Sequence, residues 1–312
     1  MKRVQSEGKM KKIGFIGLGA MGNHMARNLT KKGFAVTVYD LNPEAVQSLV
    51  NAGAKAAESC AAAAQNADIV ITVLPADRHM KAVMMNDNGV FQGASPGTTI
   101  IDMTTLSPHT SIEVAAEAQK RGLFFLDAPV SGGTIGAEKG TLTIMVGGEK
   151  QLFEQVRDVL EAMGKTIYHV GGIGIGETVK MVNQILVACN MLAISEAFVL
   201  GVKLGADPDT LLNVIKVSAG NSFLIEHRLP NYVFPGDFEQ PGFALDLLRK
   251  DVGIAMDSAR EEKVAISLTS IVYQMLTQAS SAGFGNMDMS SVIKVVESSA
   301  GVSVRKTTKT ED

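Results

Sequence analysis

The chain has 312 residues, of which 46% are hydrophobic and 20% charged, and its formal net charge at pH 7 is −3. This composition is typical of a soluble globular protein of about two domains, and it excludes a disordered or fibrous chain. Lysine and arginine residues are scattered along the sequence, which argues against nucleic acid as a partner.

Short apolar segments alternate with helical ones from residue 11 to about residue 173. This βαβ repetition predicts a doubly wound, mainly parallel sheet. The strand pattern then stops, and a long apolar helix over about 177–204, expected to be buried, precedes shorter amphipathic helices. We therefore predict an N-terminal tail (1–10), an α/β domain (11–173), an all-helical domain (174–302) and a C-terminal tail (303–312). The predicted strands cover 11–19, 35–40, 68–75, 98–103, 123–129, 141–148 and 166–172.

A glycine-rich loop follows the first predicted strand and opens a helix. It consists of Gly17, Leu18, Gly19, Ala20, Met21 and Gly22. Glycines there permit a tight turn, close approach of backbone N–H groups to a pyrophosphate, and close packing of helix on strand. The second predicted strand ends in Asp40, a carboxylate suited to a ribose hydroxyl and repulsive to a 2′-phosphate. The combination predicts a dinucleotide site that prefers NAD to NADP.

Two further glycine segments have alternative interpretations. Residues 171–176 (GGIGIG) resemble the first loop, but no strand ending in an acid follows, so we interpret them as a joint between domains. Ser131, Gly132 and Gly133 follow the strand that ends near Asp127. Their hydroxyl and open N–H groups suit a small carboxylate, although a hairpin connection would have the same composition.

Lys180 lies near the start of the long apolar helix, with Asn183 and Gln184 on the same face. A lysine in this position could simply extend its ammonium group to water. However, a cation is unfavourable in the first turn of a helix. Beside an oxidised nicotinamide, desolvation and like charge would lower its pKa and suit it to proton transfer. We therefore predict that Lys180 is catalytic.

The number of cysteines and the N-terminal sequence indicate the cellular compartment of the protein. Cys60 and Cys189 are the only cysteines, which favours a reducing compartment and offers no metal spacing. The N-terminal sequence lacks an apolar signal region, and we expect no run to reach the about 18 apolar residues of a membrane span. The sequence predicts a cytoplasmic protein without metal or membrane partner.

The stretches GFIGLGAMGNHMARNL, DAPVSGGTIGAEKGTLTIMVGG, GETVKMVNQ and LLRKD together resemble the β-hydroxyacid dehydrogenases. This resemblance covers about residues 11–300 and implies a Rossmann domain joined through a long helix to an all-α domain. It also implies a nicotinamide cofactor, a homodimer or homotetramer, and a short, carboxylate-bearing β-hydroxy acid or semialdehyde as substrate. Hydride transfer would be assisted by Lys180 as general acid or base.

The same resemblance assigns further residues. Ser131, Gly132, Gly133 and Asn183 would bind substrate, and Leu74, Pro75, Thr105 and Lys250 would contact the cofactor. Gln184 replaces the second Asn of 3-hydroxyisobutyrate dehydrogenase-like members and is frequent in semialdehyde reductase-like ones.

Two alternatives remain open at this point. An imine reductase-like enzyme would share the architecture, but the lysine of the KxxN motif is typically replaced there, and Asp40 disfavours the NADPH those enzymes use. A redox-silent dinucleotide-binding scaffold would be expected to lose Lys180. A panel of short β-hydroxy acids and their semialdehydes, followed with both NAD and NADP, tests the dehydrogenase interpretation. No response to any member would favour the scaffold.

Overall fold

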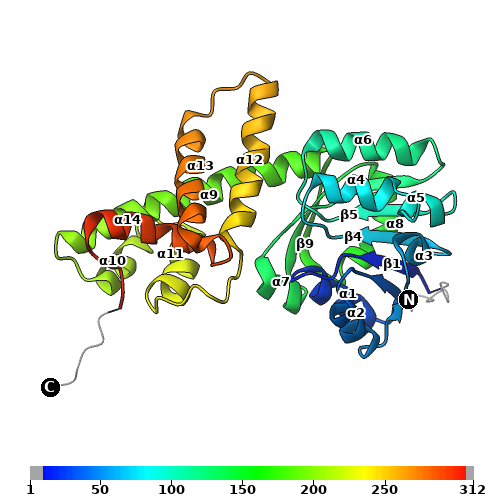
Figure 1. Ribbon diagram of the computed structural model, residues 1–312, viewed down its shortest axis with the longest axis horizontal. Helices are drawn as coiled ribbons and strands as arrows, with labels where there is room; N and C mark the ends of the chain where they lie inside the picture. Colours follow the sequence, from blue (N-terminus) through cyan, green and yellow to red (C-terminus); the bar gives the residue numbers. More distant parts are fainter. Residues whose placement is uncertain (1–9, 307–312) are drawn as a thin grey trace, which may run out of the picture. The chain divides into compact units, whose positions relative to one another are not determined.

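The structure is a computed structural model that describes residues 10–306. The chain forms two compact units, and the division between them falls after Lys180. It lies inside α9 (Ile175–Lys203), the helix that the two units share. The predicted order, an α/β domain followed by a helical one, agrees with this arrangement of elements (Figure 1). The polar segment 1–9 lies outside the described residues.

The first unit contains a sheet with strand order β3-β2-β1-β4-β5-β6-β8-β7, and β9 pairs with β8. The ladder from β3 to β6 is parallel, while β8 runs antiparallel to β6 and β7. The mainly parallel sheet is therefore confirmed. The two-residue strands β3 and β7 were not predicted, because segments this short carry no periodic signal. The strands are β1 (Lys12–Ile16), β2 (Ala35–Tyr39), β3 (Lys55–Ala56), β4 (Ile69–Thr72), β5 (Thr99–Asp102), β6 (Phe124–Asp127), β7 (Val130–Ser131), β8 (Leu142–Gly147) and β9 (Gly164–Gly171).

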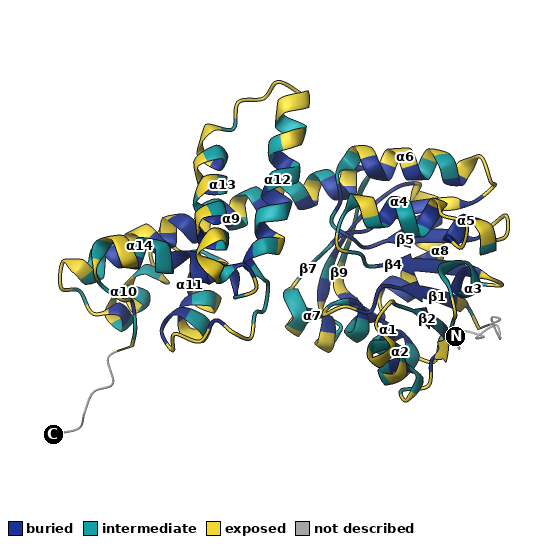
Figure 2. Ribbon diagram, viewed as in Figure 1, coloured by how far each residue is buried: buried dark blue, intermediate teal, exposed yellow. Residues whose placement is uncertain are grey.

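Helices cover both faces of this sheet, and each face has its own apolar cluster. One cluster includes Met25, Leu49 and Phe153, and the other includes Met80 and Val114. The central strands β4 and β5 between them are buried along their whole length, as Figure 2 shows. The first face carries α1 (Gly22–Lys31), α2 (Pro43–Val50), α7 (Gly133–Lys139) and α8 (Lys150–Leu160). The second carries α3 (Cys60–Ala64), α4 (Asp77–Met85), α5 (Val90–Gly93) and α6 (Pro108–Gln119).

Local sequence signals explain where several helices begin. Asn42 and Ser107 each accept a backbone N–H as N-cap, and a proline follows each of them at the first helical position. Both helices therefore start directly after a strand and its connecting loop. This arrangement leaves the carboxyl ends of the parallel strands, with their loops, along one edge of the sheet. Open α/β sheets bind ligands at that edge.

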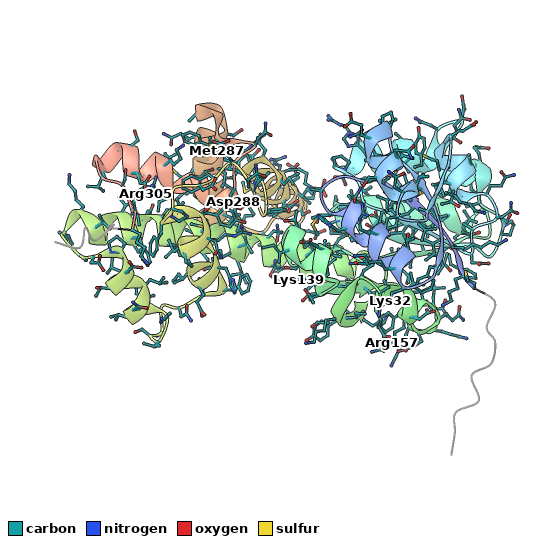
Figure 3. The ribbon with its side chains drawn as sticks, turned by 90° about the horizontal axis from the view of Figure 1, so that it is seen from below. Lys32, Lys139, Arg157, Met287, Asp288 and Arg305 are labelled. Carbon is teal, nitrogen blue, oxygen red and sulfur yellow. The ribbon has the colours of Figure 1, made fainter. Side chains whose placement is uncertain are left out.

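The second unit is helical and has a separate core. Met191 and Phe198 of α9, Leu248 of α12 and Leu276 of α13 belong to it. Asp288, labelled in Figure 3, is buried in this unit. It accepts hydrogen bonds from Arg228 (2.6 Å), the Gly242 N–H and the nearby Ser290, and so joins segments distant in sequence. The elements after α9 are α10 (Pro208–Ile215), α11 (Phe223–Arg228), the π-helix η1 (Leu229–Val233), α12 (Leu245–Glu261), α13 (Ser267–Ala279), the π-helix η2 (Ser280–Phe284), the 3₁₀-helix η3 (Met289–Val292) and α14 (Ile293–Ala300).

The long helix α9 differs from its prediction in two respects. It begins at Ile175 rather than near Glu177, which places Lys180 in the second turn instead of the first. It is also not buried on every face, because Val182, Leu186 and Leu200 are exposed. Apolar residues on every face of α9 therefore do not mean that every face is buried. The apolar residues on the outer face of this helix are available for contacts beyond the unit's own core.

By length and composition alone, α9 could cross a membrane, with a mean hydropathy of 2.1 over its best window. The expectation that no segment reaches this length and hydropathy was wrong. Met191, Ile194 and Phe198 of the helix lie in the core of the helical unit. Its amino-terminal part carries the buried polar groups of Lys180 and Gln184. We interpret α9 as a core helix.

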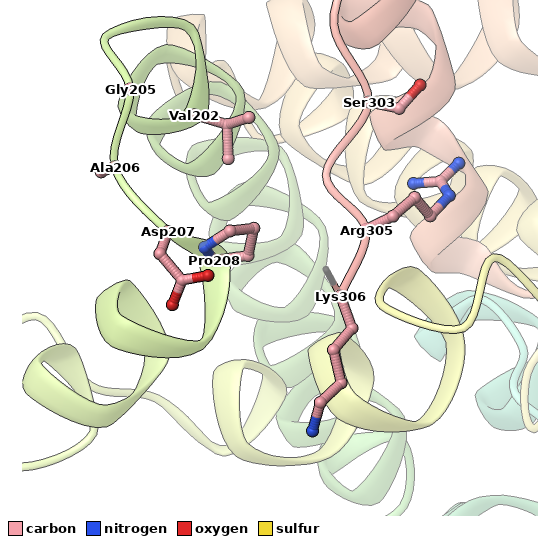
Figure 4. Close-up of a pocket in the computed structure, with 8 residues that line it drawn as sticks. All are labelled: Val202, Gly205, Ala206, Asp207, Pro208, Ser303, Arg305 and Lys306. Atoms are coloured by element: carbon pink, nitrogen blue, oxygen red, sulfur yellow. The ribbon is translucent and has the colours of Figure 1, made fainter. Parts of the chain in front are cut away.

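The segment 303–306, expected to belong to a polar tail, has defined contacts. Val304 is fully buried, and its N–H donates to Glu297, which also pairs with Arg305 at 2.7 Å. One buried apolar side chain and one ion pair hold the segment where composition alone predicts a tail. Together with α9 and the start of α10 it lines an open pocket (Figure 4). Both cations of this pocket have acidic partners, Lys306 with Asp209 at 3.6 Å.

Candidate functional site

The glycine loop between β1 and α1 has three structurally different glycines. Gly17 has φ +95°, and a Cβ there would lie 2.1 Å from the Val73 carbonyl oxygen. A Cβ on Gly22 would lie 2.0 Å from the Gly17 oxygen, so this position permits the close start of α1. At Gly19 a Cβ would meet no atom within 4 Å, and the residue is exposed. The loop thus offers open space at the start of a helix that has no side-chain cap, which suits a bound pyrophosphate.

Asp40 lies directly after β2 and is bonded to the glycine loop. Its Oδ2 accepts the Leu18 N–H at 2.6 Å, and its Oδ1 accepts the Asn42 N–H at 2.7 Å. Two backbone donors therefore fix the carboxylate beside the loop. Each oxygen keeps lone pairs for a further donor such as a ribose hydroxyl.

The loops after β4 and β5 are joined through buried polar groups. The Leu74 N–H donates to Thr104 Oγ1 at 2.9 Å, and that hydroxyl donates to Asp102 Oδ1 at 2.6 Å. Thr72 donates to the same oxygen at 2.7 Å. Burial raises the pKa of Asp102 to about 7, against the lowering effect of these hydrogen bonds. Among the predicted contact residues here, Leu74 and Thr105 are half-buried and Pro75 is exposed.

Asp127, at the end of β6, fixes the start of α9. Its carboxylate accepts the N–H groups of Gly174 (2.8 Å) and Glu177 (3.1 Å), and burial raises its pKa. A Cβ on Gly147 or Gly176 would come within 2.6 Å of this carboxylate. The segment 171–176 is therefore glycine-rich partly because a buried acid lies against it. Its role as a joint remains our interpretation.

The predicted carboxylate-binding loop is a strand followed by a short helix. Ser131 is half-buried in β7, where it pairs with Thr143 of β8. Gly132 is exposed with φ +135°, and Gly133 has φ +61° at the start of α7. Both values belong to a backbone region that L side chains rarely adopt. The loop conformation therefore depends on glycine at these positions.

Lys180 is buried, with only 6% of its surface exposed. The side chain as a whole is therefore buried, unlike that of a lysine that extends into solvent. Its position in the second turn also weakens the argument from the helix dipole, which acts mainly within the first turn. Glu177, one turn earlier on α9, is fully buried and accepts the Leu106 N–H at 3.0 Å.

In the helical unit, polar groups form a short hydrogen-bonded chain. Asn183 donates to Gln184 at 3.0 Å, and Gln184 donates to Asp251 at 2.7 Å. The other oxygen of Asp251 pairs with Lys250 at 3.0 Å. Two predicted site residues, Asn183 and Lys250, are therefore connected through two buried ones.

Sequence reasoning gave no role to several buried acids, among them Asp102, Asp127 and Asp251. Asp102 and Asp127 each end an observed strand, and Asp251 follows Lys250 in the LLRKD motif. An acid at the carboxyl end of a buried strand was the available signal for the first two. In the described part of the chain no cluster of metal-ligating side chains occurs, and both cysteines are free thiols.

Comparisons with known proteins cover nearly the whole chain. The profile described as the NAD binding domain of 6-phosphogluconate dehydrogenase matches residues 12–171. The profile described as NAD-binding of NADP-dependent 3-hydroxyisobutyrate dehydrogenase matches residues 174–296. The two profiles correspond to the α/β and the helical parts of the chain.

Individual relatives agree with these profiles. The chain is 45% identical to 2-(hydroxymethyl)glutarate dehydrogenase of Eubacterium barkeri over 94% of this chain and 97% of the relative. It is 38% identical to the NAD-dependent L-serine dehydrogenase of Pseudomonas aeruginosa, over 94% of this chain and the whole relative.

Among solved structures, 3-hydroxyisobutyrate dehydrogenase of Mycobacterium tuberculosis with L-serine is 35% identical. It superposes with a TM-score of 0.84 over 92% of this chain and 99% of that one. An imine reductase of Myxococcus stipitatus, 18% identical with a TM-score of 0.62 over 92% and 99% of the two chains, shares the fold. Because hydroxyacid dehydrogenases match the chain along most of its length, and at identities well above those of the imine reductases, it belongs to the β-hydroxyacid dehydrogenase family of nicotinamide-dependent oxidoreductases.

Proposed function

We propose that the enzyme interconverts a 2-substituted 3-hydroxypropionate and its semialdehyde, with NAD as cofactor. The substrates named for the relatives are 2-(hydroxymethyl)glutarate, 3-hydroxyisobutyrate and L-serine. All three have a primary alcohol on the carbon next to the one that bears the carboxylate, and they differ in the third substituent. The shared part of these molecules defines the proposed substrate class. The third substituent on the carbon next to the carboxylate differs from one enzyme to another.

The burial of Lys180 is the observation that carries this proposal. A lysine with 6% exposure, on a helix whose start is fixed by Asp127, has the restricted position that a proton-transfer group needs. In reduction the ammonium group donates a proton to the substrate carbonyl oxygen, and in oxidation the neutral amine accepts it from the hydroxyl. When bound, the nicotinamide supplies or accepts the hydride.

We assign the substrate carboxylate to the loop of Ser131, Gly132 and Gly133. Gly132 is exposed, and the backbone there has no side chain to block an approaching carboxylate. The Asn183 amide would hold the substrate, since one of its N–H groups is bound to Gln184 and its orientation is thereby fixed. In this proposal the first unit binds the cofactor.

The preference for NAD rests on Asp40. Its carboxylate is fixed next to the glycine loop, and the residues that follow it, Leu41 and Asn42, offer no cation to a 2′-phosphate. A negative charge at this place repels such a phosphate and accepts ribose hydroxyls. Leu74, Pro75 and Thr105 would contact the same cofactor from the neighbouring loops.

We also propose a cytoplasmic location, because the small number of cysteines favours a reducing compartment.

A substrate panel tests the proposal. Reduction of NAD and of NADP is followed by absorbance with 3-hydroxyisobutyrate, L-serine, glycerate and 2-(hydroxymethyl)glutarate. Isobutanol, which lacks the carboxylate, and 3-hydroxybutyrate, whose alcohol is secondary, serve as controls. We expect turnover with at least one member of the panel, little with either control, and a higher kcat/KM with NAD. Equal turnover of isobutanol would overturn the substrate assignment, and better use of NADP would overturn the cofactor assignment. Binding of NADH without any turnover would support a redox-silent scaffold instead.

A further inference from the structure

Three neighbouring strands of the first unit end in one row of polar residues. Thr72 of β4 is the register partner of Asp102 of β5, which is in turn the partner of Asp127 of β6. All three are fully buried. Asp127 fixes the start of α9, whereas Asp102 accepts hydrogen bonds from Thr72 and Thr104, neither of which is assigned to substrate or proton transfer in the proposed function. Its position in the middle of the row therefore needs a separate explanation.

The hydrogen bonds of Asp102 have a definite direction. Thr104 Oγ1 accepts the Leu74 N–H, so the hydroxyl proton of Thr104 is available to Asp102. The Thr104 N–H (3.2 Å) and the Thr72 hydroxyl (2.7 Å) converge on the same oxygen, Oδ1. This buried oxygen thus receives three donors and connects the end of β4 to the loop after β5. Thr104 Oγ1, which it orients, in turn holds the loop that contains Leu74. A second connection lies further along, where Ser107 donates to Asp77 at 3.0 Å.

This arrangement has an energetic cost. The other carboxyl oxygen, Oδ2, is buried and has no hydrogen-bond partner. Burying such an oxygen costs about 1 to 3 kcal/mol, and an apolar side chain of similar size would avoid this cost. Buried polar groups that lower stability in this way are concentrated at functional sites.

We propose that Asp102 is a positioning residue for the nicotinamide cofactor, because its carboxyl holds the loop after β4 and the loop after β5 in fixed relation to each other. The first loop carries Leu74 and Pro75, and the second carries Thr105. This inference rests on the proposed function, which assigns those three residues to the cofactor. Asp102 itself acts only through Thr104 and the loops. It should therefore affect cofactor affinity more than substrate affinity.

The test compares the NADH affinity of wild type with that of three variants. NADH fluorescence titrations give Kd for wild type, Asp102→Leu, Asp102→Asn and Thr104→Val, with folding checked by circular dichroism. Asp102→Leu removes the acceptor, and Thr104→Val removes the hydroxyl that connects both loops. We expect each to raise the NADH Kd by about tenfold, the effect of about one lost hydrogen bond. Asp102→Asn keeps an acceptor oxygen and should stay within about threefold of wild type.

Thr98→Val is the matched control. Thr98 is buried next to the opposite end of β5, where its hydroxyl donates to the Ala67 carbonyl oxygen at 3.1 Å. This variant loses a comparable hydrogen bond but should keep the wild-type Kd. At saturating cofactor, the hydroxy-acid KM of Thr104→Val should stay near the wild-type value.

The outcomes are distinguishable from one another. If Asp102→Leu does not fold, Thr104→Val alone decides the question. If the loop variants weaken NADH binding no more than Thr98→Val does, Asp102 is only a structural residue and the inference is overturned. If wild type binds neither NADH nor NADPH, the proposed function fails first, and the inference falls with it.

Discussion

At the scale of single residues, the chemistry depends on whether a polar group is buried and what fixes it. Lys180 is buried near the start of α9, whose first N–H groups are bound by Asp127. The side chain of a lysine in this position is held away from solvent. Removing the Lys180 amine should therefore lower turnover much more than it lowers the stability of the fold.

Lys180→Met tests this expectation. The substitution keeps the apolar stem and removes the charge, so NADH binding and the far-ultraviolet spectrum should remain. Turnover should fall by about 10² to 10⁴, the usual cost of losing a positioned acid or base. The corresponding limb of the pH–rate profile should also disappear. Asn183→Ala should keep that limb and lose less activity, because the amide holds the substrate without carrying the proton. Lys216→Met, at an exposed lysine of the helical unit, is the control. A Lys180→Met enzyme within about threefold of wild type would rule out this role.

Asp102 should make stability depend on pH. Its pKa is about 7 in the folded protein and about 4 in the unfolded chain. The folded state therefore binds more protons between these values, and the free energy of unfolding falls as pH rises through this window. Above the folded-state value it levels off. Between pH 5 and 8 the contribution of Asp102 amounts to about 2 to 3 kcal/mol.

Asp102→Asn cannot titrate, so its unfolding free energy should fall less over this range. Denaturant unfolding at pH 5 and pH 8 measures the difference. Asp87→Asn, at an exposed acid of the same unit, should retain the wild-type slope. Equal slopes for wild type and Asp102→Asn would show that Asp102 does not carry a raised pKa.

At the scale of elements, short connections place the predicted binding groups. β7 and α7 are too short for periodicity to reveal, and their conformation depends on two glycines with positive φ. A valine at Gly132 would be strained, and its Cβ would lie 3.1 Å from a methyl group of Leu142. Both effects act on the loop assigned to the substrate carboxylate.

Gly132→Val should therefore raise the KM for the hydroxy acid by about tenfold or more, while the Kd for NADH stays near the wild-type value. Steady-state kinetics and NADH titration give the two quantities. Gly97→Val is a control for strain alone, because Gly97 has φ +93° with open space around it and lies before β5, at the other edge of the sheet. An unchanged KM would remove this loop from the substrate site.

At the scale of the whole molecule, we expect a homodimer or homotetramer, as the resemblance to the family implies. The helical unit exposes several large apolar side chains, among them Leu268 (64%) and Ile271 (61%), one turn apart on α13. Exposed apolar residues grouped on one element are typical of surfaces that bind another protein chain. We propose that α13 contributes to the contact between copies of the chain.

Sedimentation velocity tests the assembly. Wild type should sediment as a dimer or tetramer, and the double variant Leu268→Lys/Ile271→Lys should shift toward monomer because it brings charge into an apolar contact. The control variant Phe124→Lys, at an exposed residue of the first unit, should sediment like the wild type. A monomeric wild type would overturn the expectation of an oligomer. An unshifted double variant would place the contact on another surface.

The sequence by itself determined the alternation of strands and helices in the first unit, the helical character of the second and the glycine turn after β1, because these depend on local patterns. Periodicity identifies a buried strand, a glycine run after a strand predicts a turn, and a lysine in an apolar helix is conspicuous. The same local reasoning misplaced the start of α9 and overstated its burial.

Only the tertiary structure decided which polar groups act together. Asp102 meets Thr72, Asp127 meets Gly174, and Gln184 meets Asp251 across 30, 47 and 67 residues of chain, respectively. No local pattern encodes such pairs. They arise because parallel strands bring their carboxyl ends to one edge of the sheet, and because helix packing in the second unit places α9 against α12. A buried acid gains its raised pKa and its partners only from that packing.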